Sequence, residues 1–277
     1  MPPTGPGRRH RAFVGQADRV QTPDARFSRD DDLPATCLAV VPVDVDDRSA
    51  PLGCAALREL RGRPLLVRAV SALVRSGVTR EVVVAVPPAL EEAVARAVPV
   101  SDVPVEVVPV HANGPGHRVL AALRARPSAP GDGAAGPGGV VVVHDPLHPL
   151  SPAALVRDVV RHLLTTPGCV AGVPARAVTD TLKWVDEDEV VQGTADREGY
   201  RMIYSPQAYL RGPLQEALAA ADDETLRAHG AHVLPHLVQA RGGLVTLVPS
   251  TGEAFRIASD DDLVLAEALL HVDAAGG

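Results

Sequence analysis

The stretch Val140-Val-Val-Val-His144-Asp145 decides the fold of this chain of 277 residues. Four consecutive valines that end at two polar residues are typical of a strand buried on both faces of a parallel sheet. From about residue 36 onward, apolar segments alternate with helical patterns, beginning with a strand at Leu38–Val43 and a helix at Pro64–Ser76. This alternation predicts an α/β fold with a Rossmann-like, doubly wound and mostly parallel sheet.

Composition divides the chain into a tail, one domain and two interruptions of that domain. Residues 1–35 are polar and rich in Pro, Gly and Asp, so we expect a disordered N-terminal tail. Residues 36–273 carry the strand and helix pattern and form the predicted domain. Inside it, the Gly-, Pro- and Ala-rich residues 127–139 predict a flexible loop. Short strand-like pieces between acidic turns at about 174–204 predict a small β-arm outside the sheet.

Composition also excludes several function classes. The formal net charge is -7 and no long Lys/Arg run exists, so nucleic acid is not an expected partner. No apolar stretch reaches the length of about 18 residues that a transmembrane helix needs, and the N-terminus lacks the apolar core of a signal peptide. The cysteines at positions 37, 54 and 169 have neither metal-like nor disulfide-like spacing, which predicts reduced thiols in a cytoplasmic protein.

Asp145 is the first candidate for chemistry, because ligands of open α/β sheets bind beyond the carboxyl ends of the strands. Its carboxylate could hold a metal ion or a substrate hydroxyl. Equally, residues 144–149 could form a turn that leads into a helix and uses Asp, His and Pro for backbone reasons. Ser151, followed by Pro152, is expected to cap that helix. On the residues alone, both interpretations of Asp145 stay open.

A second group of candidates follows the strand predicted at Cys169–Val173. The segment Asp180–Lys183 places a carboxylate, a hydroxyl and the only lysine of the chain within four residues. Further along, Arg197 could bind a phosphate group through two parallel hydrogen bonds. The alternative is an exposed hairpin edge for the first group and a plain surface charge for Arg197.

The order of these motifs is more informative than any one of them. Six segments of the chain match six motifs of one protein family in the same order. The segments are residues 142–149, 180–183, 194–197, 206–207, 222–224 and 256–263. The corresponding motifs are, in turn, L-V-H-D-A-A-R-P, D-T-[ILM]-K, T-x-D-R, P-Q, T-D-[DE] and K-[IV]-T-x-x-[DE]-D-L. With this ordered set, residues from about 36 to 271 resemble the 2-C-methyl-D-erythritol 4-phosphate cytidylyltransferase family.

The resemblance implies a fold of the nucleotide-diphospho-sugar transferase type and a homodimer joined through the β-arm. It also implies in-line attack by a phosphate oxygen of methylerythritol phosphate, a phosphorylated polyol, on the α-phosphate of CTP, with Mg2+ and release of pyrophosphate. Asp145 falls on a catalytic and metal-binding position. The residues at substrate-binding positions are His148, Thr181, Lys183, Arg197, Ser205 and Arg256.

The nucleotide half of the implied site departs from the family pattern. The family loop A-A-G-x-G-x-R aligns with residues 43–49, which read V-D-V-D-D-R-S, so both glycines are replaced. Arg48 is the arginine that remains at a catalytic position. The family's P-K falls on Ala55-Ala56, which removes a lysine, and its R-x-x-S falls on residues 115–118. The nucleotide-binding positions are occupied by Val43, Asp44, Asp47 and Pro146.

These changes predict weak binding of CTP. Two unit charges about 8 Å apart interact by about 2 kcal/mol at an effective dielectric constant of about 20, so carboxylates at 44, 46 and 47 would repel a triphosphate. Three functions stay open. The first is an active cytidylyltransferase with a loop rebuilt around a metal ion, and the second is a non-catalytic relative that keeps a phosphorylated ligand. The third is a transferase with another nucleotide donor. The nucleotide loop favours the second.

Overall fold

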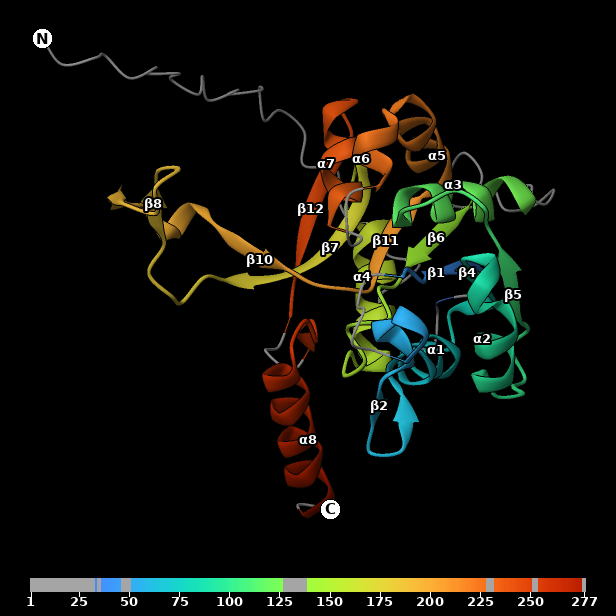
Figure 1. Cartoon of the computed structure of the whole chain (residues 1–277). Coiled ribbons are helices and arrows are strands. Elements are labelled where there is room, and N and C mark those ends of the chain that lie inside the picture. Colours follow the sequence, from blue (N-terminus) through green and yellow to red (C-terminus); the bar gives the residue numbers. More distant parts are fainter. Residues whose placement is uncertain are drawn as a thin grey trace, which may run out of the picture.

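The computed structural model describes residues 33, 36–45, 51–126, 139–227, 232–250 and 254–275 (Figure 1). The remainder of the predicted tail and residues 127–138 of the predicted loop therefore lie outside the described residues. Leu33, which the sequence placed in the tail, is buried in the hydrophobic core with 9% of its surface exposed.

The described residues form a mixed, mostly parallel sheet of eight strands, which confirms the predicted α/β fold. The strand order is β10-β7-β11-β6-β1-β4-β5, and β12 lies beside β7. Strands β10 and β11 run antiparallel to their neighbours, and the other pairings are parallel. The bounds are β1 Cys37–Pro42, β4 Thr79–Val86, β5 Val105–Pro109, β6 Val140–Val143, β7 Cys169–Ala177, β10 Arg201–Ile203, β11 Gln207–Leu210 and β12 Leu244–Pro249.

Helices cover both faces of the sheet, which explains why β1 and β6 are apolar on both sides. Val41 and Val142 pack into the core layer of α1 (Leu65–Arg75), α2 (Glu91–Ala97) and α4 (Ala153–Thr165). Val40 and Val143 face the opposite layer. That layer contains α3 Pro115–Ala125, α5 Arg211–Ala220, α6 Asp223–Arg227 and α7 Val233–Ala240.

Three local features differ from the sequence predictions. The sequence did not predict the hairpin of β2 (Glu59–Leu60) and β3 (Arg63–Pro64), because its strands are too short for a period-2 pattern. It also missed β11, which follows Pro206 directly and carries no alternation of apolar and polar residues. The predicted cap was wrong: α4 begins at Ala153 with no side-chain cap, and the hydroxyl of Ser151 donates instead to the carbonyl of Ser205 at 2.6 Å.

Two elements extend away from the body (Figure 1). The predicted β-arm contains the antiparallel pair β8 (Lys183–Val185) and β9 (Val191–Thr194). The terminal helix α8 (Asp260–Ala275) runs beside the β2–β3 hairpin, where Arg58 forms an ion pair with Asp260. Among the described helices, none has the length and apolar character to cross a membrane.

Candidate functional site

The candidate site lies where β1 and β6 end side by side. These strands are parallel neighbours, with Val40 opposite Val143, so the residues that follow them meet at one edge of the sheet. Asp145 follows β6 and Asp44 follows β1. This is the edge at which α/β sheets bind ligands.

A cavity of about 350 Å3 opens next to Asp145. Four of the predicted site residues line it together, namely Asp145, His148, Ser205 and Arg256. Its other walls come from β10, from β11 and the residues just before it, from the residue before α7, and from the region where α8 begins. These walls are formed by Met202, Ile203, Tyr204, Gln207, His232, Phe255 and Asp262.

The carboxylate of Asp145 is buried among donors. Its Oδ1 accepts the backbone N–H of Leu147 at 2.9 Å, and its Oδ2 accepts from Arg256 Nε at 3.2 Å. His148 Nδ1 lies 3.6 Å from the same Oδ2, an electrostatic contact that is too long for a hydrogen bond. Burial alone would raise the pKa of Asp145, but His148, Arg256 and the Leu147 N–H more than offset it and hold the pKa well below its usual value. Asp145 is therefore an ionised acceptor at neutral pH.

Ser205 connects this carboxylate to a buried histidine. Its Oγ accepts the backbone N–H of Asp145 at 2.8 Å and lies 2.9 Å from Nδ1 of His144. Within the described residues, His144 Nε2 and His148 Nδ1 are buried without hydrogen-bond partners. His148 packs edge-on against Tyr204, with ring centroids 6.5 Å apart. The site thus holds two imidazoles beside one carboxylate.

His144 should make the stability of the fold depend on pH. Burial, with the nearby His148, lowers the pKa of His144 from 6.5 to about 3. The unfolded chain therefore takes up a proton below about pH 6.5 and the folded chain does not, so stability falls as the pH falls from 6.5 toward 3. The slope from this one group is at most about 1.4 kcal/mol per pH unit.

Urea denaturation at two pH values checks this expectation. The loss of stability between pH 7 and pH 5 should shrink in His144→Asn and should persist in the exposed control His111→Asn. Equal pH dependence in the two variants would show that His144 is not responsible. Asp145 does not contribute to this difference between pH 7 and pH 5. Its pKa is lowered in the folded chain, so the stability that it contributes is lost only below about pH 4, where the unfolded chain takes up a proton.

The candidates on the β-arm do not reach this cavity within one chain. Thr181, Lys183 and Arg197 are exposed, because β7 runs out of the sheet and carries the arm away from the body. Lys183 Nζ donates to Thr194 Oγ1 at 2.6 Å, and Arg197 donates to the carbonyl of Thr179. The predicted substrate residues are therefore divided between the cavity and the arm.

The nucleotide half contains an ion pair that the sequence did not predict. Asp44 Oδ1 accepts the backbone N–H of Val45 at 3.0 Å and lies 3.1 Å from Nη2 of Arg118. The side chain of Arg118 is only 1% exposed, and its Nε and Nη1 have no hydrogen-bond partner among the described residues. Burial lowers the pKa of Arg118, an effect that Asp44 opposes. Arg118 therefore partly offsets the charge of Asp44.

The other nucleotide positions are buried or lie outside the described residues. Val43 is fully buried and donates its N–H to the carbonyl of Ala85 at 2.9 Å, and Pro146 is also buried. Asp47 and Arg48 lie outside the described part of the chain.

Helix α6 packs tightly on the start of α3, where Arg118 is located. A Cβ atom on Gly114 would come within 2.4 Å of the Arg227 backbone, and one on Gly116 within 3.0 Å of the Leu226 backbone. Gly114 also has φ +97, a conformation that favours glycine. Sequence reasoning could have found Arg118 from one signal: it lies four residues before the buried Ala122, on the helix face that packs against the sheet.

The residues around Asp145 do not by themselves form a magnesium site. Both carboxylate oxygens of Asp145 already accept hydrogen bonds, and the described residues contain no group of three or more acidic, histidine or cysteine side chains suited to a metal ion. Asp262 lines the same cavity, but its Oδ2 accepts the N–H groups of Ala258 and Ser259 at the start of α8. Mg2+ prefers one or two carboxylates completed by water and phosphate oxygens, so a nucleotide would have to supply the rest.

Comparison with known proteins gives a consistent result. The sequence model of the family described as 2-C-methyl-D-erythritol 4-phosphate cytidylyltransferase matches residues 45–272. A protein of that name from Frankia casuarinae is 40% identical over 215 residues, which cover 78% of this chain and 73% of the relative. Another from Saccharopolyspora erythraea is 37% identical over 219 residues, which cover 78% of this chain and 90% of the relative. The solved structure of the Thermus thermophilus protein of the same name matches with a TM-score of 0.62 and 28% sequence identity. The match covers 84% of this chain and 98% of that protein.

Proposed function

The chain belongs to the 2-C-methyl-D-erythritol 4-phosphate cytidylyltransferase family, and from this premise we propose that it binds a phosphorylated polyol in the Asp145 cavity while transfer from CTP is impaired or lost. The relatives of this chain are named for cytidylyl transfer to 2-C-methyl-D-erythritol 4-phosphate. By the family resemblance, that reaction belongs to isoprenoid biosynthesis. We place the protein in the cytoplasm, since its three cysteines are free thiols.

The ion pair between Asp44 and Arg118 is the observation that carries this proposal. Arg118 occupies a position that, by resemblance, reads the nucleotide, and Asp44 occupies a position of the phosphate-binding loop. Their contact fills nucleotide positions with side chains. A CTP molecule would have to separate the pair and leave a buried guanidinium without its acid, which is costly.

The polyol half retains groups suited to its ligand. The ionised Asp145 can accept hydrogen bonds from sugar hydroxyls, and Arg256 at the cavity wall can pair with a phosphate. The exposed Lys183 and Arg197 would add positive charge if the β-arm of a second subunit reached this cavity. We therefore include a homodimer in the proposal, with each arm completing the site of its partner.

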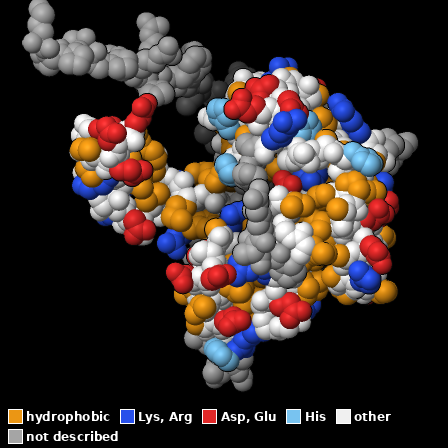
Figure 2. All heavy atoms as spheres, viewed as in Figure 1, with side chains coloured by type: hydrophobic (Ala, Val, Ile, Leu, Met, Phe, Trp, Pro, Cys, Tyr) orange, Lys and Arg blue, Asp and Glu red, His pale blue; other side chains and the backbone are white. Residues whose placement is uncertain are grey.

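Exposed apolar side chains on the arm support this dimer (Figure 2). Trp184 is 57% exposed, Val190 is 55% exposed and Val191 is 58% exposed. Clustered apolar residues on a projecting hairpin are typical of an interaction surface. A second subunit is the partner that the family resemblance indicates.

Active nucleotidyl transfer is the second candidate function. Nε and Nη1 of Arg118 favour it, because these buried donors have no partner within the described residues and could bind acceptor atoms of a nucleotide other than CTP. Alternatively, a loop rebuilt around Mg2+ could restore CTP binding, with Asp145 and the nucleotide phosphates holding the metal.

Calorimetric titration separates the two halves of the site. Methylerythritol phosphate should bind more tightly than CTP, and its binding should weaken at least about tenfold in Arg256→Gln, because a charge-assisted contact is lost. The matched control is Arg241→Gln, which removes an exposed arginine elsewhere and should leave the affinity unchanged. Micromolar CTP binding in the presence of Mg2+ would contradict the proposal.

Pyrophosphate release measures the transfer itself. With CTP, methylerythritol phosphate and Mg2+, the wild-type protein should release no more pyrophosphate than Arg197→Ala does. Release that disappears in Arg197→Ala would identify an enzyme and favour the second candidate. The same assay with the other nucleoside triphosphates tests a different donor.

A further inference from the structure

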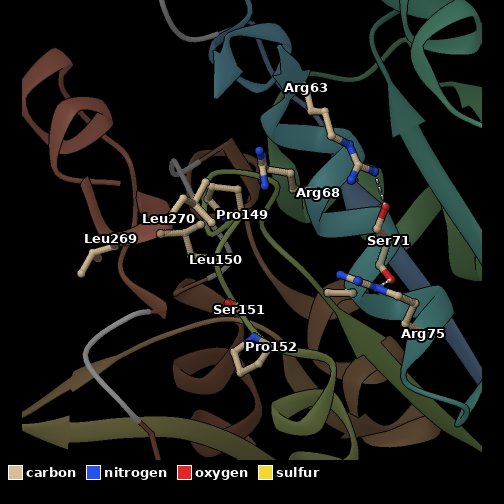
Figure 3. A pocket seen from close by; sticks show the side chains of 11 residues that line it. Arg63, Arg68, Ser71, Arg75, Pro149, Leu150, Ser151, Pro152, Leu269 and Leu270 are labelled. Atoms are coloured by element: carbon tan, nitrogen blue, oxygen red, sulfur yellow. Dashed lines mark hydrogen bonds between the residues drawn. The ribbon is translucent and has the colours of Figure 1, made fainter. Parts of the chain in front are cut away.

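A second cavity, of about 170 Å3, lies away from the Asp145 cavity (Figure 3). We call it the arginine pocket. None of its lining residues is among those that the family resemblance assigns to substrate or nucleotide. It is formed by α1, the β2–β3 hairpin, the segment before α4 and the second half of α8. The lining residues are Arg63, Arg68, Ser71, Ala72, Arg75, Pro149, Leu150, Ser151, Pro152, Leu269 and Leu270.

Helical spacing places the polar groups on one face. Arg68, Ser71 and Arg75 are three and seven residues apart on α1, so they follow one another along the same side of the helix. Arg63 reaches this face from β3, and Figure 3 shows its guanidinium beside Ser71. Three guanidinium groups from two elements therefore meet at one cavity.

Neutral oxygen atoms hold these guanidinium groups in place. Arg68 donates from Nε and Nη2 to the carbonyl of Leu60 at 3.2 and 2.7 Å. Arg63 Nη2 donates to Ser71 Oγ at 3.2 Å, and Arg75 Nε donates to the carbonyl of Ser71 at 3.3 Å. In the part of the chain that the structure describes, none of the three has a carboxylate partner, and the lining contains no acid.

Among the side chains that the structure describes, no carboxylate therefore balances the positive charge of the pocket. The pKa of Arg68 is lowered by burial and by repulsion from Arg63 and Arg61. An anion between the guanidinium groups would relieve this repulsion. A phosphate group suits the geometry best, because it offers several acceptor oxygens to planar guanidinium donors.

The opposite wall of the pocket is apolar. Pro149, Leu150 and Leu270 lie across the cavity from the arginines in Figure 3. A neighbouring cavity of about 300 Å3 shares Arg63 and Arg75, and it leaves room beyond the guanidinium groups. A bare inorganic anion would leave the apolar wall unused.

We propose that the arginine pocket binds a small phosphate ester with a short apolar chain. The phosphate group lies between Arg63, Arg68 and Arg75. The apolar chain packs against Leu150 and Leu270. The site is separate from the polyol cavity and does not depend on how CTP is handled.

Titration with n-butyl phosphate in low-salt buffer tests this site. The experiment uses Arg256→Gln as the background, so that phosphate binding in the Asp145 cavity is weakened whatever the proposed function proves to be. Binding should remain in that background and should weaken at least about tenfold when Arg63→Gln and Arg75→Gln are added. The matched control adds Arg96→Gln and Arg241→Gln, which removes two exposed arginines elsewhere and should leave the affinity unchanged.

Two results would overturn the inference. Equal affinity in the pocket variant and in the matched control would show that the arginine pocket does not hold the phosphate. Equal affinity for inorganic phosphate and n-butyl phosphate would remove the role of Leu150 and Leu270. Circular dichroism of every variant ensures that a loss of binding reflects the pocket and not unfolding.

Discussion

Asp44→Ala should lower the free energy of unfolding by about 3 kcal/mol, a large effect for a single residue in a loop. The variant leaves the charge of Arg118 buried at 1% exposure and removes the acid that pairs with it among the described residues. The reverse change, Arg118→Met, should cost less than about 1 kcal/mol. Asp44 is 20% exposed, so water can solvate its charge, and it still accepts the hydrogen bond from the Val45 N–H. The double variant should recover most of the stability that Asp44→Ala loses.

Urea denaturation of the four proteins measures this cycle. The matched control is Glu81→Ala, which removes one of the acids beside the partly exposed Arg126 and should cost less than about 1 kcal/mol. If Asp44→Ala cost no more than Glu81→Ala, Arg118 would have another source of compensation. The pair between Asp44 and Arg118 would then not be what closes the nucleotide half.

Trp184→Asp should convert the proposed homodimer into a monomer at micromolar concentration. Trp184 is a large, 57% exposed side chain near the tip of the arm, where a partner subunit would bury it. Loss of a buried aromatic anchor in an interface commonly costs about 2 kcal/mol or more, and a new carboxylate adds a desolvation penalty. The dimer dissociation constant should rise by about a hundredfold.

Sedimentation at several protein concentrations checks this result. The control is Val100→Asp, which places the same charge on a fully exposed valine outside the arm and should leave the dimer intact. A wild-type protein that is already monomeric, or equal dissociation by the two variants, would contradict the arm-mediated dimer. In a monomer, methylerythritol phosphate should also bind more weakly, because Lys183 and Arg197 of the partner are lost.

Much of the fold was predictable because its strands are buried on both faces. Runs such as Val140–Val143 and helices such as Leu65–Arg75 carry strong, regular patterns. Strand β11 carries no such pattern, since it is short and its neighbours in the sheet determine its conformation. Pairing between segments distant in the sequence leaves no periodic signal.

The candidate site was predictable only in part, for a similar reason. Motif order indicated the residues around Asp145, and the structure places four of them on one cavity. The contact between Asp44 and Arg118 joins residues 74 positions apart, which no local pattern reveals. The arginine pocket likewise depends on tertiary structure, because residues of α1 and of α8, distant in the sequence, line it together.

The exposure of Lys183 has a practical consequence for labelling chemistry. It is the only lysine of the chain, and it lies on the arm. An amine-reactive fluorophore can therefore attach at one side chain, apart from the N-terminal amine. Its emission would report whether a second subunit covers the arm, without any engineered cysteine.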